Sequence, residues 1–163
     1  MIKKRCLFAL LCLIVAFSFI HSEENSEEES ESVQAFPSQV FPPYAIINAS
    51  YKGDEGMVRT ILAAGVDKDV RDSLGATALH ISMYQQNLNI VKMLLDYGFD
   101  PNVKDNKEHT PLYAAVVANN LAAARLLIRY GANKYARDLN GYTPLDRARK
   151  DEKSDMISLL SRS

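Results

Sequence analysis

The sequence has no tryptophan, few cysteines and almost no net charge. Its 163 residues contain two cysteines, Cys6 and Cys12, and the formal charge is −1. Because both thiols lie at the N-terminus, the rest of the chain has no cysteine nucleophile, disulfide framework or cysteine metal site. The balanced charge provides no basic field for DNA or RNA, so we expect no nucleic-acid partner. The length suggests one domain with short additions.

Sequence signatures of catalysis are also missing. The chain has no glycine-rich phosphate loop and no serine on a sharp turn beside a base. A metal site needs three or four converging ligands, and beyond the N-terminal segment the histidines are His80 and His109. We therefore expect no catalytic residue, cofactor or bound metal. An enzyme or a metal protein is the least favoured alternative.

The N-terminus is built from a basic start followed by an apolar run. Residues 1–5 read MIKKR, and the fifteen residues 6–20 are almost entirely apolar. A helix of this run spans about 22 Å, short of a hydrocarbon core of roughly 30 Å. We therefore predict a signal peptide over residues 1–22, with the cleavage site open, and a periplasmic or secreted protein. The alternative is membrane attachment through an uncleaved leader or through a lipidated Cys12.

An acidic segment follows the apolar run. Residues 23–38 include six glutamates and several serines, with nothing strongly apolar before Val33. Such a composition buries too little surface to offset its ordering entropy, so we predict a disordered tether. A contact arm for a basic partner is the alternative.

The rest of the chain repeats with a period of 33 residues. Thr77, Thr110 and Thr143 share this spacing, and self-similarity at a fixed period is the sequence signature of a repeat architecture. Further positions keep the same register: Asp72, Asp105 and Asp138; Gly65, Gly98 and Gly131; Ile46, Leu79, Leu112 and Leu145.

Each unit contains the signals for two helices. The threonine is an N-cap, and Pro111 and Pro144 follow at the first helical position, where a missing N–H costs nothing. The first helix should end near Tyr84 or Val117. A second amphipathic helix should end at Gly98 or Gly131 in the left-handed conformation. One such pair cannot bury its apolar face alone, so neighbouring units must stack.

These residues resemble the ankyrin repeat family, whose unit has a TPLH-type helix start and an Asp-x-x-Gly hairpin loop. The matching phrases begin at Thr77, Thr110 and Thr143. The resemblance implies an all-α solenoid of stacked helix-turn-helix units joined by β-hairpin-like loops. The predicted units are an N-terminal cap at 39–71, full repeats at 72–104 and 105–137, and a truncated C-terminal cap at 138–163.

One column supports the two caps. It reads Asn48, Ile81, Ala114 and Arg147, apolar in the middle units and polar in the end units. Because terminal units of a solenoid need a polar outer face, this column indicates that the first and last units are caps.

The resemblance also implies binding of a protein partner, through hairpin tips and the concave face of the first helices. The chain is then a monomeric exported interaction module, or alternatively a secreted effector that acts on a host protein. The candidate contact residues are Arg71, Ser73, Leu74, Tyr84, Gln85, Lys104, Asn106, Lys107, Glu108, His109, Arg137, Leu139, Asn140 and Tyr142.

Three of these candidates form a column of one cation per unit. Arg71, Lys104 and Arg137 each stand directly before the repeated aspartate. The favoured interpretation is a solvated loop edge partly neutralised by those aspartates. The alternative is a basic ladder that binds an acidic partner or the chain's own glutamate segment.

The loop DNKEHTPLY at residues 105–113 departs from its two counterparts. Glu108 stands where the others have Gly75 and Gly141, so a slot that requires positive φ would strain it. We expect Glu108 and His109 to face solvent at the loop tip. The resemblance further implies that His80 hydrogen-bonds within and between the loops.

Overall fold

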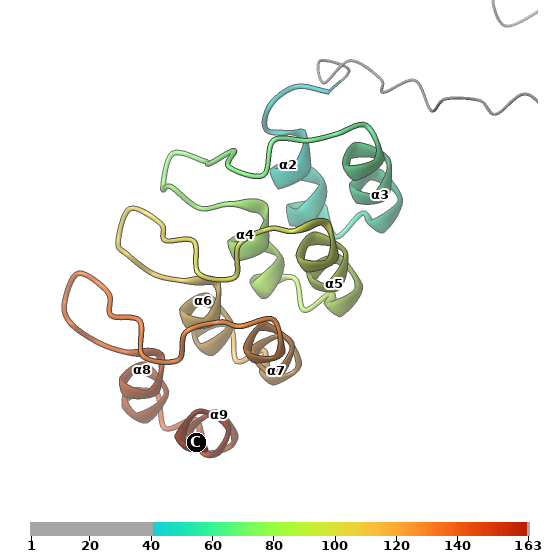
Figure 1. Cartoon of the computed structure of the whole chain (residues 1–163). Coiled ribbons are helices and arrows are strands. Elements are labelled where there is room, and N and C mark those ends of the chain that lie inside the picture. The colour runs from blue at the N-terminus through green and yellow to red at the C-terminus, as the bar shows by residue number, and fades with distance from the viewer. Residues whose placement is uncertain (1–40, 163) are drawn as a thin grey trace, which may run out of the picture. The chain divides into compact units, whose positions relative to one another are not determined.

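The computed structural model describes residues 41–162, which form helices joined by turns and loops, with no strand in that range (Figure 1). The predicted signal peptide at 1–22 and the predicted acidic tether at 23–38 both lie outside the described residues. Within the described range, no helix is long and apolar enough to cross a membrane. The helices are α2 (Ala45–Lys52), α3 (Glu55–Ala63), α4 (Ala78–Tyr84), α5 (Leu88–Tyr97), α6 (Pro111–Val117), α7 (Leu121–Arg129), α8 (Pro144–Lys150) and α9 (Ser154–Ser161).

The helices form two layers. The first helices, α2, α4, α6 and α8, stack in one row, and the second helices, α3, α5, α7 and α9, stack behind them (Figure 1). Long loops project from the row of first helices on one side. This arrangement confirms the predicted all-α solenoid. The exact boundaries between units stay a prediction.

The first helices begin where the threonines predict. Thr110 and Thr143 accept hydrogen bonds from the N–H groups of Tyr113 and Asp146. Asp146 returns the bond by accepting from the Thr143 N–H at 3.0 Å, which completes a capping box. Tyr44 precedes α2 without a side-chain cap bond. The threonine register therefore sets three of the four first-helix starts.

A second column caps the second helices. Asp54, Asn87 and Asn120 each accept N–H groups from the first turn of α3, α5 and α7. Asn120 also donates to the Met83 carbonyl at the end of α4, 3.1 Å away. In the last unit Lys153 stands in this column, and its ammonium donates to the carbonyls of Val116 and Val117. The column therefore joins each unit to its neighbour.

The core lies between the two layers and between successive units. The repeated apolar column places Ile46, Leu79 and Leu112 out of solvent entirely. A second column on the second helices, Ile61, Leu94, Leu127 and Leu160, is buried as well. Stacking therefore buries the face that a single helix pair would expose.

The repeated aspartates shape the loops. Asp105 Oδ1 accepts the N–H groups of Lys107 and His109, both at 2.8 Å, and Asp72 and Asp138 do the same in their own loops. Neighbouring loops are then joined by backbone bonds, from Asn106 N–H to the Leu74 carbonyl and from Leu139 N–H to the Lys107 carbonyl. The loops thus form a continuous wall beside the first helices.

Candidate binding groove

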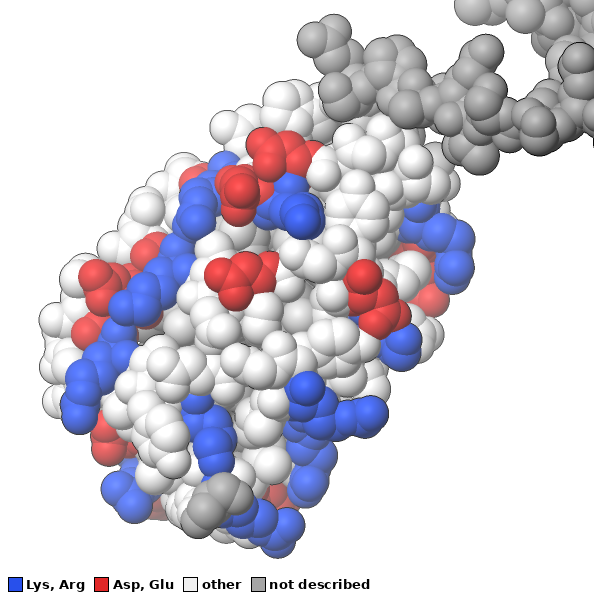
Figure 2. All heavy atoms as spheres, viewed as in Figure 1, with Lys and Arg blue, Asp and Glu red and all other residues white. Residues whose placement is uncertain are grey.

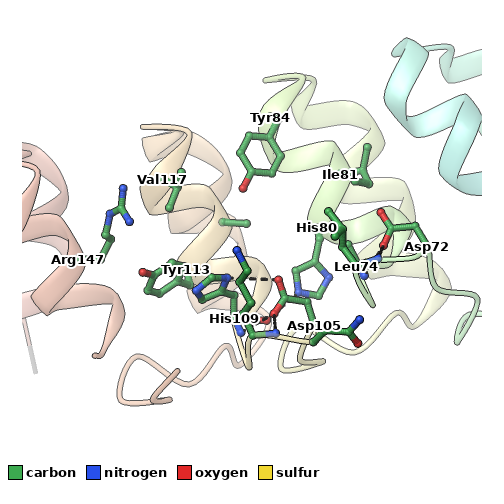
Figure 3. Close-up of a pocket in the computed structure, with 14 residues that line it drawn as sticks. Asp72, Leu74, His80, Ile81, Tyr84, Asp105, His109, Tyr113, Val117 and Arg147 are labelled. Carbon is green, nitrogen blue, oxygen red and sulfur yellow. Dashed lines mark hydrogen bonds and ion pairs between the residues drawn. The ribbon is translucent and has the colours of Figure 1, made fainter. Parts of the chain in front are cut away.

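A cavity of about 320 Å³ lies between the loop wall and the first helices (Figure 3). It spans the units that contain α4 and α6 and reaches α8 at one end. The residues that line it are Asp72, Leu74, Ala76, His80, Ile81, Tyr84, Asp105, Asn106, Lys107, His109, Tyr113, Ala114, Val117 and Arg147.

The rim of the cavity is accessible and largely apolar. Leu74 on the first loop is 66% exposed, and Tyr84 at the end of α4 is 53% exposed. Burial raises the pKa of the Tyr84 hydroxyl, and the nearby Asp105 charge raises it further. The hydroxyl therefore stays protonated at physiological pH and can donate or accept a hydrogen bond.

His80 holds the floor of the cavity together. Its Nδ1 accepts the Thr77 N–H at 3.2 Å, which leaves Nε2 to donate to the His109 carbonyl at 3.0 Å. Burial lowers the pKa of His80, so the imidazole is neutral and its tautomer is set by these two bonds. The expected bonds within and between loops are therefore confirmed, and His80 is structural.

His109 is turned inward, so the expectation that it faces solvent is wrong. Its ring stacks on Tyr113 with centroids 4.1 Å apart and planes within 8°. Nδ1 lies 3.3 Å from Asp105 Oδ2, and Nε2 lies 3.7 Å from Asp138 Oδ2. The side chain is only 23% exposed. Stacking on a neighbouring aromatic ring, with a carboxylate near each nitrogen, outweighs solvation at the loop tip.

Glu108 does face solvent, and its slot does require positive φ. Its φ is +60°, compared with +77° at Gly75 and +81° at Gly141. The Glu108 carboxylate reaches Lys104 Nζ at 2.8 Å while remaining 47% exposed. The loop therefore keeps its shape with a strained residue at the tip.

The column of cations has a structural role that the sequence did not indicate. Arg71 donates to the Lys104 carbonyl at 2.6 Å, and Lys104 donates to the Arg137 carbonyl at 3.3 Å. Figure 2 shows basic side chains, with acidic ones beside them, along the loop edge. Arg71 and Lys104 therefore each tie their own loop to the next one.

The cavity brings together five of the candidate contact residues. Leu74, Tyr84, Asn106, Lys107 and His109 line it. The other candidates lie outside it, in the turn after α4 in the case of Gln85 and on the loops in all other cases: Arg71, Ser73, Gln85, Lys104, Glu108, Arg137, Leu139, Asn140 and Tyr142.

Ile81, Ala114 and Arg147 line the cavity, although the sequence pattern indicated only that their column distinguishes middle units from caps. Ile81 lies three residues before Tyr84, and residues at that spacing share a helix face. Once Tyr84 is placed in the groove, this helical spacing and the 33-residue period are therefore sufficient to predict that the three residues line it.

The described part of the chain holds no group of three or more histidine, cysteine, aspartate or glutamate side chains placed to bind a metal ion. Asp105, His109 and Asp138 come closest to such a cluster. The Oδ1 atoms of Asp105 and Asp138 each accept two loop amides, and their Oδ2 atoms lie beside the His109 ring.

Stacked helix pairs with a loop wall along one face define a helical repeat protein with an open groove. The family model described as "Ankyrin repeats (3 copies)" matches residues 20–105, 46–138 and 98–163, which together cover most of the sequence. The chain belongs to the ankyrin repeat family. A search of curated proteins gave no match to it.

Proposed function

We propose that this protein binds a protein partner in the groove between its loop wall and its first helices, without catalysing a reaction. Ankyrin repeats indicate a protein–protein interaction module. The observation that carries the proposal is the cavity of about 320 Å³, whose rim presents Leu74 and Tyr84 to solvent. Exposed aromatic and apolar anchors in a preformed hollow are typical of residues that dominate binding energy.

The mechanism is non-covalent association with a preorganised surface. Loop-to-loop hydrogen bonds and the His80 bridge fix the wall before a partner arrives. Because little backbone ordering is left to occur on binding, less of the interaction energy is lost to entropy. A single copy of the chain is sufficient to form this groove, so we propose that the protein acts as a monomer.

Affinity capture with the full chain tests the groove. The variant Leu74→Ser/Tyr84→Ser removes both rim anchors, and we expect it to lose the proteins that the parent chain retains. The matched control is Met57→Ser/Tyr97→Ser, which removes exposed side chains of α3 and α5 instead. Equal capture by the parent and the groove variant would reject the proposal.

The candidates on the loop edge and tips are proposed as secondary contacts for the same partner. Reversing Arg71 or Lys104 would also break a bond to the next loop. Arg137→Glu is the cleaner test of a basic ladder, because among residues 41–162 its guanidinium bonds within its own loop, to Gly141. Weaker capture is expected if the ladder contacts an acidic partner, and unchanged capture would exclude that role.

Export is proposed from the basic start and the apolar run at residues 6–20. Fractionation of cells that produce the full chain should place it in the periplasm or the medium. Retention in the cell envelope would exclude the secreted effector, and recovery in the cytoplasm would exclude export altogether.

A further inference from the structure

The groove cavity combines apolar walls with a carboxylate at its base. Leu74, Ile81 and Val117 lie along its sides, and Figure 3 shows the Asp105 carboxylate between His80 and His109, below Tyr84. The two oxygens of Asp105 differ in their partners. Oδ1 accepts two loop amides, whereas within residues 41–162 the one hydrogen-bond or ion-pair partner of Oδ2 is the His109 ring. One oxygen of Asp105 therefore has capacity for another donor.

Asp105 is the charged group with the strongest influence on the two polar side chains beside it, His80 and Tyr84. Among the charges that act on His80, Asp105 raises its pKa more than Arg71 lowers it, although burial is the largest effect and lowers it overall. At Tyr84, after burial, Asp105 again has a larger effect on the pKa than Arg147. Asp72 adds a second carboxylate to the lining.

Arg147 does not cancel this charge. Its Nε donates to Asp151 at 2.9 Å, and its guanidinium lies 6.0 Å from the centre of the Tyr113 ring. The charge of Arg147 is thus paired with Asp151 at the α8 end of the cavity, away from its base. Lys107 also lines the cavity, but its side chain is on an exposed loop tip.

We propose that this cavity is the anchor site for a cationic side chain, arginine or lysine, of the partner. The aliphatic stem packs on Leu74, Ile81 and Val117, and the charged head reaches Asp105 Oδ2. Long basic side chains bury their methylene stems on apolar surface and keep the charge on a polar partner. The volume is at the lower end of the range for ligand pockets, which suits one side chain. This inference rests on the proposed groove function and adds the chemistry of the partner.

Other anchors fit the cavity less well. An acidic side chain would meet Asp72 and Asp105 directly. An aliphatic side chain would cover Asp105 and remove water from it without supplying a counter-charge, which is costly for a carboxylate. Charge complementarity therefore selects a cation.

Small capped amino acids test this without knowledge of the partner. The probes are N-acetyl-arginine amide, N-acetyl-leucine amide and N-acetyl-glutamate amide, titrated at equal concentrations into the ¹⁵N-labelled full chain. We expect the arginine probe to shift the backbone amide signals of Tyr84, Asp105 and Val117 at the lowest concentration. A stronger response to the leucine or glutamate probe would overturn the inference, as would the absence of any response at these signals.

Asp105→Asn tests the carboxylate itself. The amide oxygen can still accept the two loop N–H groups, while the charge is removed. We expect the arginine probe to bind about tenfold more weakly, because the amide NH2 that replaces Oδ2 is a donor and cannot accept from the guanidinium, so the charge-assisted hydrogen bond is lost. The matched control is Asp138→Asn, which has the same loop role but does not line the cavity, and which should bind the probe as the parent does.

The probe titrations and the partner capture together distinguish failure of the cationic anchor from failure of the proposed groove function. Unchanged arginine binding in Asp105→Asn overturns the cationic anchor. If that variant does not give a folded amide spectrum, Leu74→Ser replaces it, because Leu74 is one of the three side chains on which the stem packs. Unchanged arginine binding in Leu74→Ser overturns the anchor equally. A leucine preference combined with partner capture that depends on Leu74 and Tyr84 rejects the cation and retains the groove. Capture that does not depend on them rejects the proposed function itself.

Discussion

At the residue scale, the tip of the second loop has a backbone conformation that the other loops assign to glycine. Glu108 has a φ of +60° and an exposed ion pair with Lys104. Left-handed backbone costs a non-glycine residue about 1–2 kcal/mol, whereas an exposed ion pair contributes about 0–1 kcal/mol. The strain is therefore larger than the compensation visible in the folded state.

We predict that Glu108→Gly raises the free energy of unfolding by about 0.5 kcal/mol. The free energy gained by relieving the backbone strain exceeds the free energy lost with the ion pair and with the greater conformational entropy of glycine in the unfolded state. Urea denaturation followed by circular dichroism measures the change. Glu108→Ala is the control, because it loses the ion pair and keeps the strain, so it should be less stable than both. A glycine variant no more stable than the alanine variant would contradict this account.

Gly75 and Gly141 offer a second comparison at this scale. Both have positive φ, but a Cβ at Gly75 would lie 2.8 Å from the backbone nitrogen of Asn106, whereas a Cβ at Gly141 has nothing within 4 Å. We predict that Gly75→Ala lowers the free energy of unfolding by about 3 kcal/mol and Gly141→Ala by about 1 kcal/mol. Thermal unfolding of both variants measures the difference. Equal losses would show that the approach of the two loops is not tight.

His80 gives the stability a pH dependence. Burial lowers its pKa below the ordinary value of 6.5, so the unfolded state takes up a proton more readily than the folded state. The contribution of His80 to the free energy of unfolding is therefore complete above pH 6.5, and it is lost as the pH falls toward the lowered pKa of the folded state.

We predict that the parent chain loses stability between pH 7 and pH 5.5 with a His80 contribution of at most about 1.4 kcal/mol per pH unit. In His80→Gln that contribution should disappear, and glutamine can still accept at the N3 position of a capping box. Urea titrations at several pH values measure both slopes. Parallel slopes in the two proteins would contradict the prediction.

At the element scale, Lys153 caps the C-terminal end of α6, although it belongs to the following unit. Its side chain is only 17% exposed and donates to the carbonyls of Val116 and Val117 and to Asp151. Helix C-termini leave carbonyls without partners, and this ammonium supplies the missing donors.

We predict that Lys153→Met lowers the free energy of unfolding by about 1–3 kcal/mol, because buried carbonyls and a carboxylate lose a donor. Lys150→Met is the control, since Lys150 is exposed in the adjoining helix and should change stability by less than about 0.5 kcal/mol. Hydrogen exchange at the amides near the end of α6 would locate the effect. Equal stability of the two variants would show that water satisfies these carbonyls.

The sequence predicted the parts of each element that depend on one residue type at one position. The helix-start threonines, the left-handed glycine Gly98 and the positive-φ slot at Glu108 follow from local backbone chemistry. The position of His109 depends on Tyr113 and on carboxylates of two different loops, so no local pattern could indicate it. The same holds for Lys153, whose partners lie 36 and 37 residues away.

A further positive-φ column was missed for a related reason. Gln86, Asn119 and Glu152 have φ of +54° at the turn between the two helices of their units, where the first unit has Gly53. Because only one of these four residues is glycine, the residue types at this position did not predict a positive φ. Likewise, five of the candidate contact residues line the groove, whereas Ile81, Ala114 and Arg147 line it without having been predicted as contacts.

At the scale of the whole molecule, the last unit covers the third. α8 packs on α6, and α9 packs on α7. We predict that deletion of residues 138–163 exposes these apolar faces, and that the shortened protein aggregates. Size-exclusion chromatography and a urea transition measure the outcome. A monomeric, cooperatively unfolding chain ending at residue 137 would contradict the capping role.

The two side-chain bonds that Arg71 and Lys104 make along the loop edge have the same polarity, whereas the backbone amides of Asn106 and Leu139 donate in the opposite direction. Arg71 donates to the carbonyl of residue 104, and Lys104 donates to the carbonyl of residue 137, so each loop supplies a donor to the loop that follows. A unit such as 105–137 is therefore a cassette with a donor at one boundary and an acceptor at the other. Copies of that cassette, inserted in tandem, would present matching ends to one another, and the groove would lengthen in steps of one cassette.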